Sequence, residues 1–61
     1  MTFKEAKADL KENGITLTYK PEWDEYRANF VGGREATAYY SPSLDDAFYT
    51  GMDMATFPKG R

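Results

Sequence analysis

Hydrophobic and polar residues alternate along three short segments of the chain, at 15–20, 25–30 and 35–40. A period of two is typical of strands that bury one face and leave the other in water. Pro21 begins a polar turn between the first two segments. The pair Gly32-Gly33 tolerates the positive φ that a tight hairpin needs between the second and third. The pattern predicts a three-stranded antiparallel meander.

A helix is predicted before these strands, at residues 3–12. Thr2 and Glu5 have the spacing of a capping box, in which each side chain bonds the other residue's backbone N–H. Gly14 is placed for the left-handed turn that commonly ends a helix. The apolar residues on one face of this helix are Phe3, Ala6 and Leu10.

A second helix is predicted after the strands, beginning near Ser43, which is a good N-cap residue. Gly51 lies inside this helix, where glycine costs about 1 kcal/mol relative to alanine, so we expect a close contact with another backbone there. Pro58 and Gly60 disfavour further helix. The apolar residues of the predicted helix at helical spacing are Leu44, Phe48, Met52 and Ala55.

The order of these elements predicts a two-layer α+β domain, α-β-β-β-α, in which both helices pack on one face of the sheet. Residues 1–56 form this single domain and residues 57–61 a short C-terminal tail. We expect the covered face to carry Leu17, Ala28, Phe30, Ala36 and Ala38, with Phe3, Tyr40 and Phe48 also in the core. The opposite, open face is expected to carry Thr16, Thr18, Arg27, Asn29, Glu35, Thr37 and Tyr39.

Composition excludes several classes of site. The 61 residues include no cysteine and no histidine, which removes disulfides, thiolate zinc sites and most transition-metal sites. No cofactor motif, spaced calcium loop or catalytic constellation is present, so we expect neither metal nor cofactor and no enzymatic activity. The amino-terminal segment has no apolar core of signal-peptide length, and no run is long enough to span a membrane. The sequence therefore predicts a cytoplasmic protein.

Aromatic residues make up 16% of the chain, more than the small predicted core requires. Trp23 falls in a turn, Tyr39 on the open face and Tyr49 beside the apolar stripe of its helix. Exposed Trp and Tyr are enriched at protein interfaces, so these three are candidate contacts for a protein partner or for a second copy of the chain. Equally, Trp23 is expected to fold back over the edge of the sheet as a lid on the core.

Nucleic-acid binding is the alternative function. Lys20, Arg27 and Tyr39 on the open face would form a polar platform with an aromatic ring on which single-stranded bases stack. An ordinary solvated sheet face explains the same residues, because Glu25 and Glu35 flank Arg27. The net charge of −2 and the isoelectric point of 4.9 argue mildly against a general nucleic-acid binder.

Acidic residues suggest a third class of function. Asp45 and Asp46 open the second predicted helix, where the family of double-stranded-RNA-binding domains, which shares this order of elements, carries lysines that grip phosphates. Aspartates there would repel phosphate. A spaced acidic face can instead mimic DNA and inhibit a host nucleic-acid-binding complex, although helix capping and solvation explain the same residues. The further acidic residues are Glu22, Asp24, Glu25 and Asp53.

The strand ending in Glu35-Ala36-Thr37-Ala38-Tyr39-Tyr40 and the following Ser43-Leu44-Asp45-Asp46-Ala47 together resemble small, uncharacterised accessory proteins of phage and prophage genomes. This resemblance implies a biological setting, and it implies no activity and no site residue.

Overall fold

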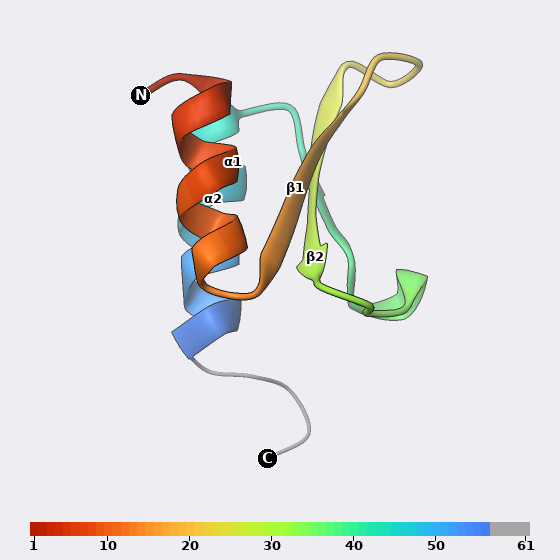
Figure 1. The fold of residues 1–61 in the computed structure, drawn as a ribbon. Helices are drawn as coiled ribbons and strands as arrows, with labels where there is room; N and C mark the ends of the chain where they lie inside the picture. The colour runs from red at the N-terminus through yellow and green to blue at the C-terminus, as the bar shows by residue number, and fades with distance from the viewer. Residues whose placement is uncertain (57–61) are drawn as a thin grey trace.

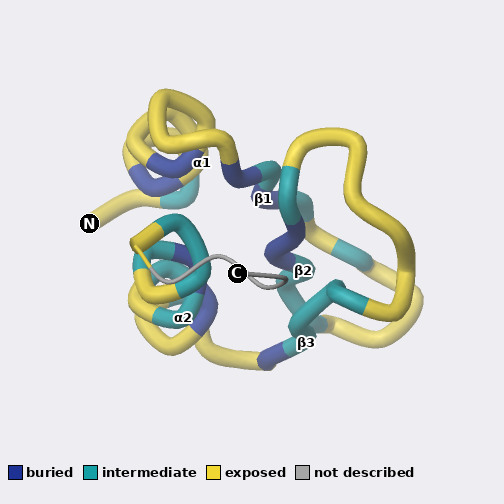
Figure 2. The backbone as a smooth tube through the Cα atoms, turned by 90° about the horizontal axis from the view of Figure 1, so that it is seen from below, coloured by how far each residue is buried: buried dark blue, intermediate teal, exposed yellow. Residues whose placement is uncertain are grey.

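The computed structural model describes residues 1–56, and the predicted tail at 57–61 lies outside the described residues. Both helices pack on the same face of a three-stranded antiparallel sheet (Figure 1), which confirms the predicted two-layer α+β architecture. Seen end-on, α1 lies nearer β1 and α2 nearer β3 (Figure 2). The elements are α1 (Phe3–Glu12), β1 (Ile15–Lys20), β2 (Glu25–Phe30), the 3-10 helix η1 (Glu35–Thr37), β3 (Tyr39–Ser41) and α2 (Leu44–Thr56).

Helix α1 begins and ends where its sequence predicts. The Glu5 N–H donates to Thr2 Oγ1 and the Thr2 N–H donates to Glu5 Oε1, both at 3.1 Å, so the capping box is present. Gly14 follows the helix with φ +81°. Ala6 and Leu10 are fully buried against the sheet.

The core lies between the helices and the sheet. Strands β1 and β2 pair in the register Ile15–Phe30, Leu17–Ala28 and Tyr19–Tyr26, which places all of these residues on the covered face. The fully buried hydrophobic residues are Ala6, Leu10, Ile15, Leu17, Ala28 and Ala47. Most have small or medium side chains, so the two layers approach closely.

Helix α2 is capped by Ser43, whose Oγ accepts from the Asp46 N–H at 3.3 Å. Gly51 makes the close contact that its position suggested, but the neighbour is a side chain rather than a backbone. A Cβ at Gly51 would lie 2.9 Å from Leu10 Cδ2. The glycine therefore allows α2 to pack against Leu10 of α1, at the centre of the helical layer.

The third strand is much shorter than predicted. Residues 35–37 form η1, and only Tyr39–Ser41 pairs with β2. As a result Ala36 is exposed and does not belong to the core. The alternation at 35–40 predicts one continuous strand, but a 3-10 helix occupies its first half. The connection between β2 and β3 instead turns away from the ladder before rejoining it.

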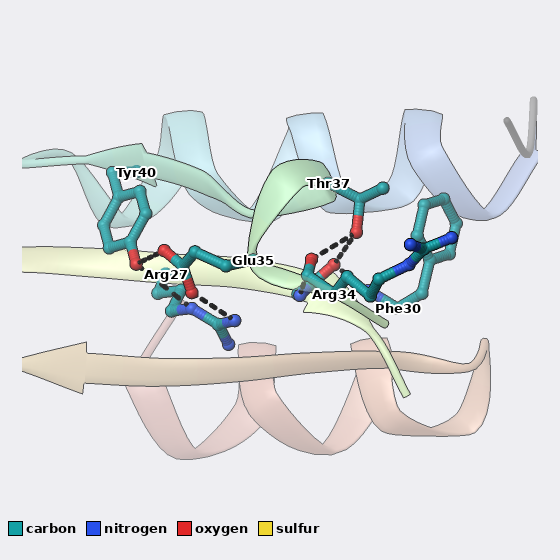
Figure 3. A network of polar contacts seen from close by, with 7 residues as sticks. Arg27, Phe30, Arg34, Glu35, Thr37 and Tyr40 are labelled. Atoms are coloured by element: carbon teal, nitrogen blue, oxygen red, sulfur yellow. Dashed lines mark hydrogen bonds and ion pairs between the residues drawn. The ribbon is translucent and has the colours of Figure 1, made fainter. Parts of the chain in front are cut away.

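Asn29 helps to hold this detour in place. It lies on the open face of the sheet, as predicted, but it is buried beneath the following loop instead of solvated. Only 1% of its surface is exposed. Its Oδ1 accepts from the Phe30 N–H at 2.8 Å and from Thr37 Oγ1 at 2.6 Å, while its Nδ2 donates to the Arg34 carbonyl at 3.0 Å. The amide thus binds the Phe30 N–H, which points toward the β3 side of the sheet, and ties the following loop to the end of β2 (Figure 3).

The glycine pair contributes in two different ways. Gly32 has φ +74°, as a tight turn requires. Gly33 does not have a positive φ, and it is needed because the loop folds back on β2. A Cβ at Gly33 would lie 2.8 Å from Asn29 Oδ1 and 3.0 Å from the Phe30 carbonyl oxygen. Close approach, and not backbone freedom, requires the second glycine.

Candidate interaction surface

Trp23 is presented by the turn between β1 and β2. Its N–H donates to the Lys20 carbonyl at 3.2 Å, with Pro21 at the second position of the turn as expected. Asp24 then takes a left-handed conformation, with φ 52°, and its carboxylate accepts from the Tyr19 hydroxyl. This well-bonded turn leaves Trp23 60% exposed.

The indole of Trp23 rests on the open face of the sheet, against Tyr40. The two ring centroids are 5.7 Å apart and the rings meet edge to face, at 68°. Trp23 is therefore partly packed and largely exposed, and its ring meets Tyr40 on the open face and does not cover the core as a lid would. An exposed indole held in this way has already lost part of its rotational freedom.

Tyr40 is held in turn by two charged neighbours. Arg27 Nε donates to the Tyr40 hydroxyl at 3.3 Å, and the hydroxyl donates to Glu35. Arg27 Nη2 lies 3.0 Å from Glu35 Oε1, the one ion pair among residues 1–56 (Figure 3). β2, η1 and β3 each contribute one member. We call the surface formed by Trp23, Arg27, Glu35 and Tyr40 the Trp23 face.

These contacts alter the acid–base properties of the Trp23 face. The hydrogen bond from Tyr40, followed by that from Arg27, lowers the pKa of the Glu35 carboxyl below its usual value of 4.5. The same bond to Glu35 raises the pKa of the Tyr40 hydroxyl above 10.0. At neutral pH the carboxylate is ionised and the phenol is not, so the bond persists and Arg27 is neutralised by its partner.

Tyr39 and Tyr40 each lie on the other face of the sheet from the one that the sequence predicts. Tyr39 pairs with Ala28 and Tyr40 with Arg27, so Tyr39 shares the covered face and Tyr40 the open face. The Tyr39 hydroxyl donates to Asp46 of α2. Because the side-chain period is two, the different path of residues 35–38 reverses the faces of the residues that follow.

The structure keeps some of the predicted site residues on one face and separates others. Of Lys20, Arg27 and Tyr39, the first two belong to β1 and β2, while Tyr39 faces the helical layer. Of the three candidate protein contacts, Trp23 lies on the open face and Tyr49 on α2. Tyr49 is 63% exposed, and the centroid of its ring lies 5.4 Å from that of Phe48. Trp23 and Tyr49 thus lie on opposite layers.

Sequence reasoning missed Tyr40 as the support for Trp23, because it placed Tyr40 in the core. A signal was present: Asn29 lies shortly before a glycine pair, and asparagine commonly bonds nearby backbone in turns. Weighing that signal would have predicted a structured loop after β2. After such a loop, the sequence alone does not determine which face of the sheet each of residues 39–41 lies on.

In the described part of the chain, no three acidic side chains come close enough to hold a metal ion. Across residues 1–56, no helix has both the length and the apolar character needed to cross a membrane.

Comparison with known proteins adds no relative to this picture. No protein family, curated protein or solved structure matches the chain.

Proposed function

We propose that this chain is a small, non-enzymatic binding protein of the cytoplasm that contacts a protein partner through the Trp23 face. One observation carries the proposal: Trp23 is 60% exposed and yet its ring is held against Tyr40, which Arg27 and Glu35 position. Trp, Tyr and Arg are the residues most enriched among those that dominate binding energy in protein interfaces. An anchor held in place before binding also loses less conformational freedom when the complex forms.

A protein partner is favoured over nucleic acid by the charges on this surface. Arg27 is paired with Glu35 at 3.0 Å, so a phosphate would have to compete with a carboxylate already in place. Tyr39, the aromatic ring that the nucleic-acid hypothesis required, faces α2. The net charge of −2 would repel a polyanion at long range. The hypothesis of an acidic inhibitor is weakened as well, because Asp46 accepts from Tyr39 and helps to start α2.

Peptides that are selected from a random display library for binding to the folded protein test the proposal. We expect Trp23→Ala to weaken the selected peptides about 30-fold, the effect of losing a dominant contact of about 2 kcal/mol. Tyr49→Ala is the matched control, since it removes an equally exposed ring from the opposite layer. Fluorescence anisotropy measures both variants.

Two results would contradict the proposal. In one, Tyr49→Ala weakens the selected peptides while Trp23→Ala does not. In the other, an oligonucleotide shifts the NMR signals of Arg27 and Tyr40 in a salt-dependent manner, which would favour the nucleic-acid hypothesis. Sedimentation at several concentrations tells whether the partner is a second copy of the chain. In that case Trp23→Ala is expected to yield a monomer.

A further inference from the structure

The charged residues of α1 are sorted by sign onto two flanks of the helix. Lys4, Lys7 and Lys11 are spaced by three and four residues, so they form one row. The acidic residues Glu5, Asp9 and Glu12 form a second row in the same way. Every pair of charged side chains three or four positions apart in α1 is therefore a pair of like charges, and none is an opposite pair.

Two lysines of this row, Lys7 and Lys11, lie beside β1. A hollow of about 280 Å³ opens there, between α1 and the strand. Its lining residues are Lys7, Lys11, Thr16, Leu17 and Val31. Leu17 is fully buried at this place, whereas Val31 is 63% exposed. The lining is almost wholly apolar, and Lys7 and Lys11 contribute their alkyl stems to it.

Strand β1 is an edge strand of the sheet, whose order is β1-β2-β3. The Val31 N–H donates to the Gly14 carbonyl at 3.0 Å, which sets the alternation of hydrogen bonds between β1 and β2. By that alternation Thr16 and Thr18 bond β2, while the backbone groups of Ile15, Leu17 and Tyr19 point outward, away from β2. Leu17 is buried under the groove and Tyr19 is exposed.

We propose that this groove binds an extended, acidic peptide segment of a partner protein. Within residues 1–56 none of the three lysines has a carboxylate within 4.0 Å, and the Lys7 ammonium lies 5.8 Å from the centroid of the Phe3 ring, so no ion pair competes with an acidic ligand. The outward-pointing backbone groups of β1 and the exposed side chain of Val31 suit an extended peptide with alternating acidic and apolar residues. A nucleic acid fits less well, because the groove is lined by apolar side chains and its lining residues include no aromatic ring on which a base could stack. This groove is distinct from the Trp23 face.

A fluorescein-labelled, end-blocked hexapeptide in which glutamate alternates with leucine tests the proposal. We expect it to bind the full chain at low salt, and Lys7→Glu to weaken binding about tenfold or more. The substitution should leave α1 folded, because the carboxylate introduced at position 7 is flanked by Lys4 and Lys11. Circular dichroism checks the fold. Arg34→Glu is the matched control, since it changes the net charge equally and lies outside the lining of the groove.

NMR signals should shift on titration at Lys7, Lys11, Thr16 and Val31. Trp23→Ala should leave the affinity unchanged, which separates this site from the Trp23 face. The proposal is overturned if the peptide does not bind at millimolar concentration, or if Lys7→Glu binds as well as the unaltered chain. Equal binding of a peptide with lysine in place of glutamate, or loss of binding in Trp23→Ala, would overturn it too.

Discussion

Asn29 holds the connection between β2 and β3 in place through a single buried amide. Its side chain accepts from the Phe30 N–H and the Thr37 hydroxyl and donates to the Arg34 carbonyl, so it joins the end of β2 to the following loop. Buried polar groups without partners are costly, so removing this side chain affects three other residues at once. The loop then carries Glu35, the carboxylate that positions both Arg27 and Tyr40.

Replacing Asn29 by alanine is expected to lower the free energy of unfolding by about 2 kcal/mol, because it leaves buried polar groups without partners. Urea denaturation followed by circular dichroism measures the change. Thr37→Val is the control, since it removes only one donor of the network, and about 1 kcal/mol is expected for it. If the two variants lose the same stability, Asn29 does not organise the loop.

Gly33→Ala is expected to cost about 1–3 kcal/mol, because the new Cβ would lie 2.8 Å from Asn29 Oδ1 and must push the loop outward. The cost should be smaller when Asn29→Ala is already present, since one of the crowded atoms is then missing. Urea denaturation of the two single variants and the double variant measures this coupling. Strictly additive losses would show that Gly33 does not meet Asn29.

At the scale of elements, α1 is stabilised by its ends and by its buried face, and not by its surface charges. The capping box and the burial of Ala6 and Leu10 favour the helix. Its like-charged pairs oppose it, each by about 0.2–0.5 kcal/mol. These like-charged pairs lower the stability of α1. Their presence is consistent with a requirement for a basic flank beside β1.

Asp9→Lys is therefore expected to stabilise the protein by about 0.5–1 kcal/mol. The new ammonium group would follow Glu5 by four positions and precede Glu12 by three, which turns two repulsions into attractions. Asp9→Asn serves as the control, because it only removes the repulsions and should give about half the gain. Thermal unfolding at low and at high salt measures both, and the gain should shrink as salt increases. A destabilised Asp9→Lys variant would contradict this account of α1.

At the scale of the whole molecule, three tyrosine–carboxylate bonds join elements that are apart in the sequence or close a turn. Tyr39 bonds Asp46 across β3 and α2, and Tyr40 bonds Glu35 across β3 and η1. Tyr19 bonds Asp24 within the first hairpin. Each bond requires a protonated phenol and an ionised carboxyl group, so the fold depends on pH at both ends of the scale.

Stability is expected to be greatest between about pH 5 and pH 10. Hydrogen bonds from Tyr40 and Tyr39 lower the carboxyl pKa values of Glu35 and Asp46 below 4.5 and 3.8. The contribution of these two carboxyl groups to stability is therefore complete above their usual pKa values and is lost as the pH falls through their lowered pKa values. The pKa values of Tyr19, Tyr39 and Tyr40 are raised above 10.0, chiefly by hydrogen bonds to the same kind of carboxylate. Their contribution is lost as the pH rises beyond 10.0.

Urea midpoints measured from pH 3 to pH 8 check the acid limb of this profile. Glu35→Gln should flatten the loss of stability below pH 5, because the lowered pKa of that carboxyl group is then absent. Glu22→Gln is a suitable control, since it removes an exposed carboxylate in the first turn that is not part of these three pairs. Identical pH profiles for Glu35→Gln and the unaltered chain would remove Glu35 from this explanation.

Local signals in the sequence were enough to predict α1, β1, β2 and α2 and the side of the sheet that both helices cover. Thr2 with Glu5 caps one helix and Ser43 the other, and residues 15–20 and 25–30 alternate without interruption. These signals act between residues close in the chain, so they survive without knowledge of the fold. Trp23 was also identified as a candidate contact from its position in a turn.

Tertiary structure alone decided the path of residues 31–38, the faces of Tyr39 and Tyr40, and the pairing of Arg27 with Glu35. These features depend on the burial of Asn29 and on the register of β3 with β2, both of which arise from contacts across the loop. A period of two cannot reveal where a strand is interrupted, and one interruption exchanges the two faces of everything after it. The composition of the Trp23 face was set by that exchange, because it brought Tyr40, and not Tyr39, beneath the indole.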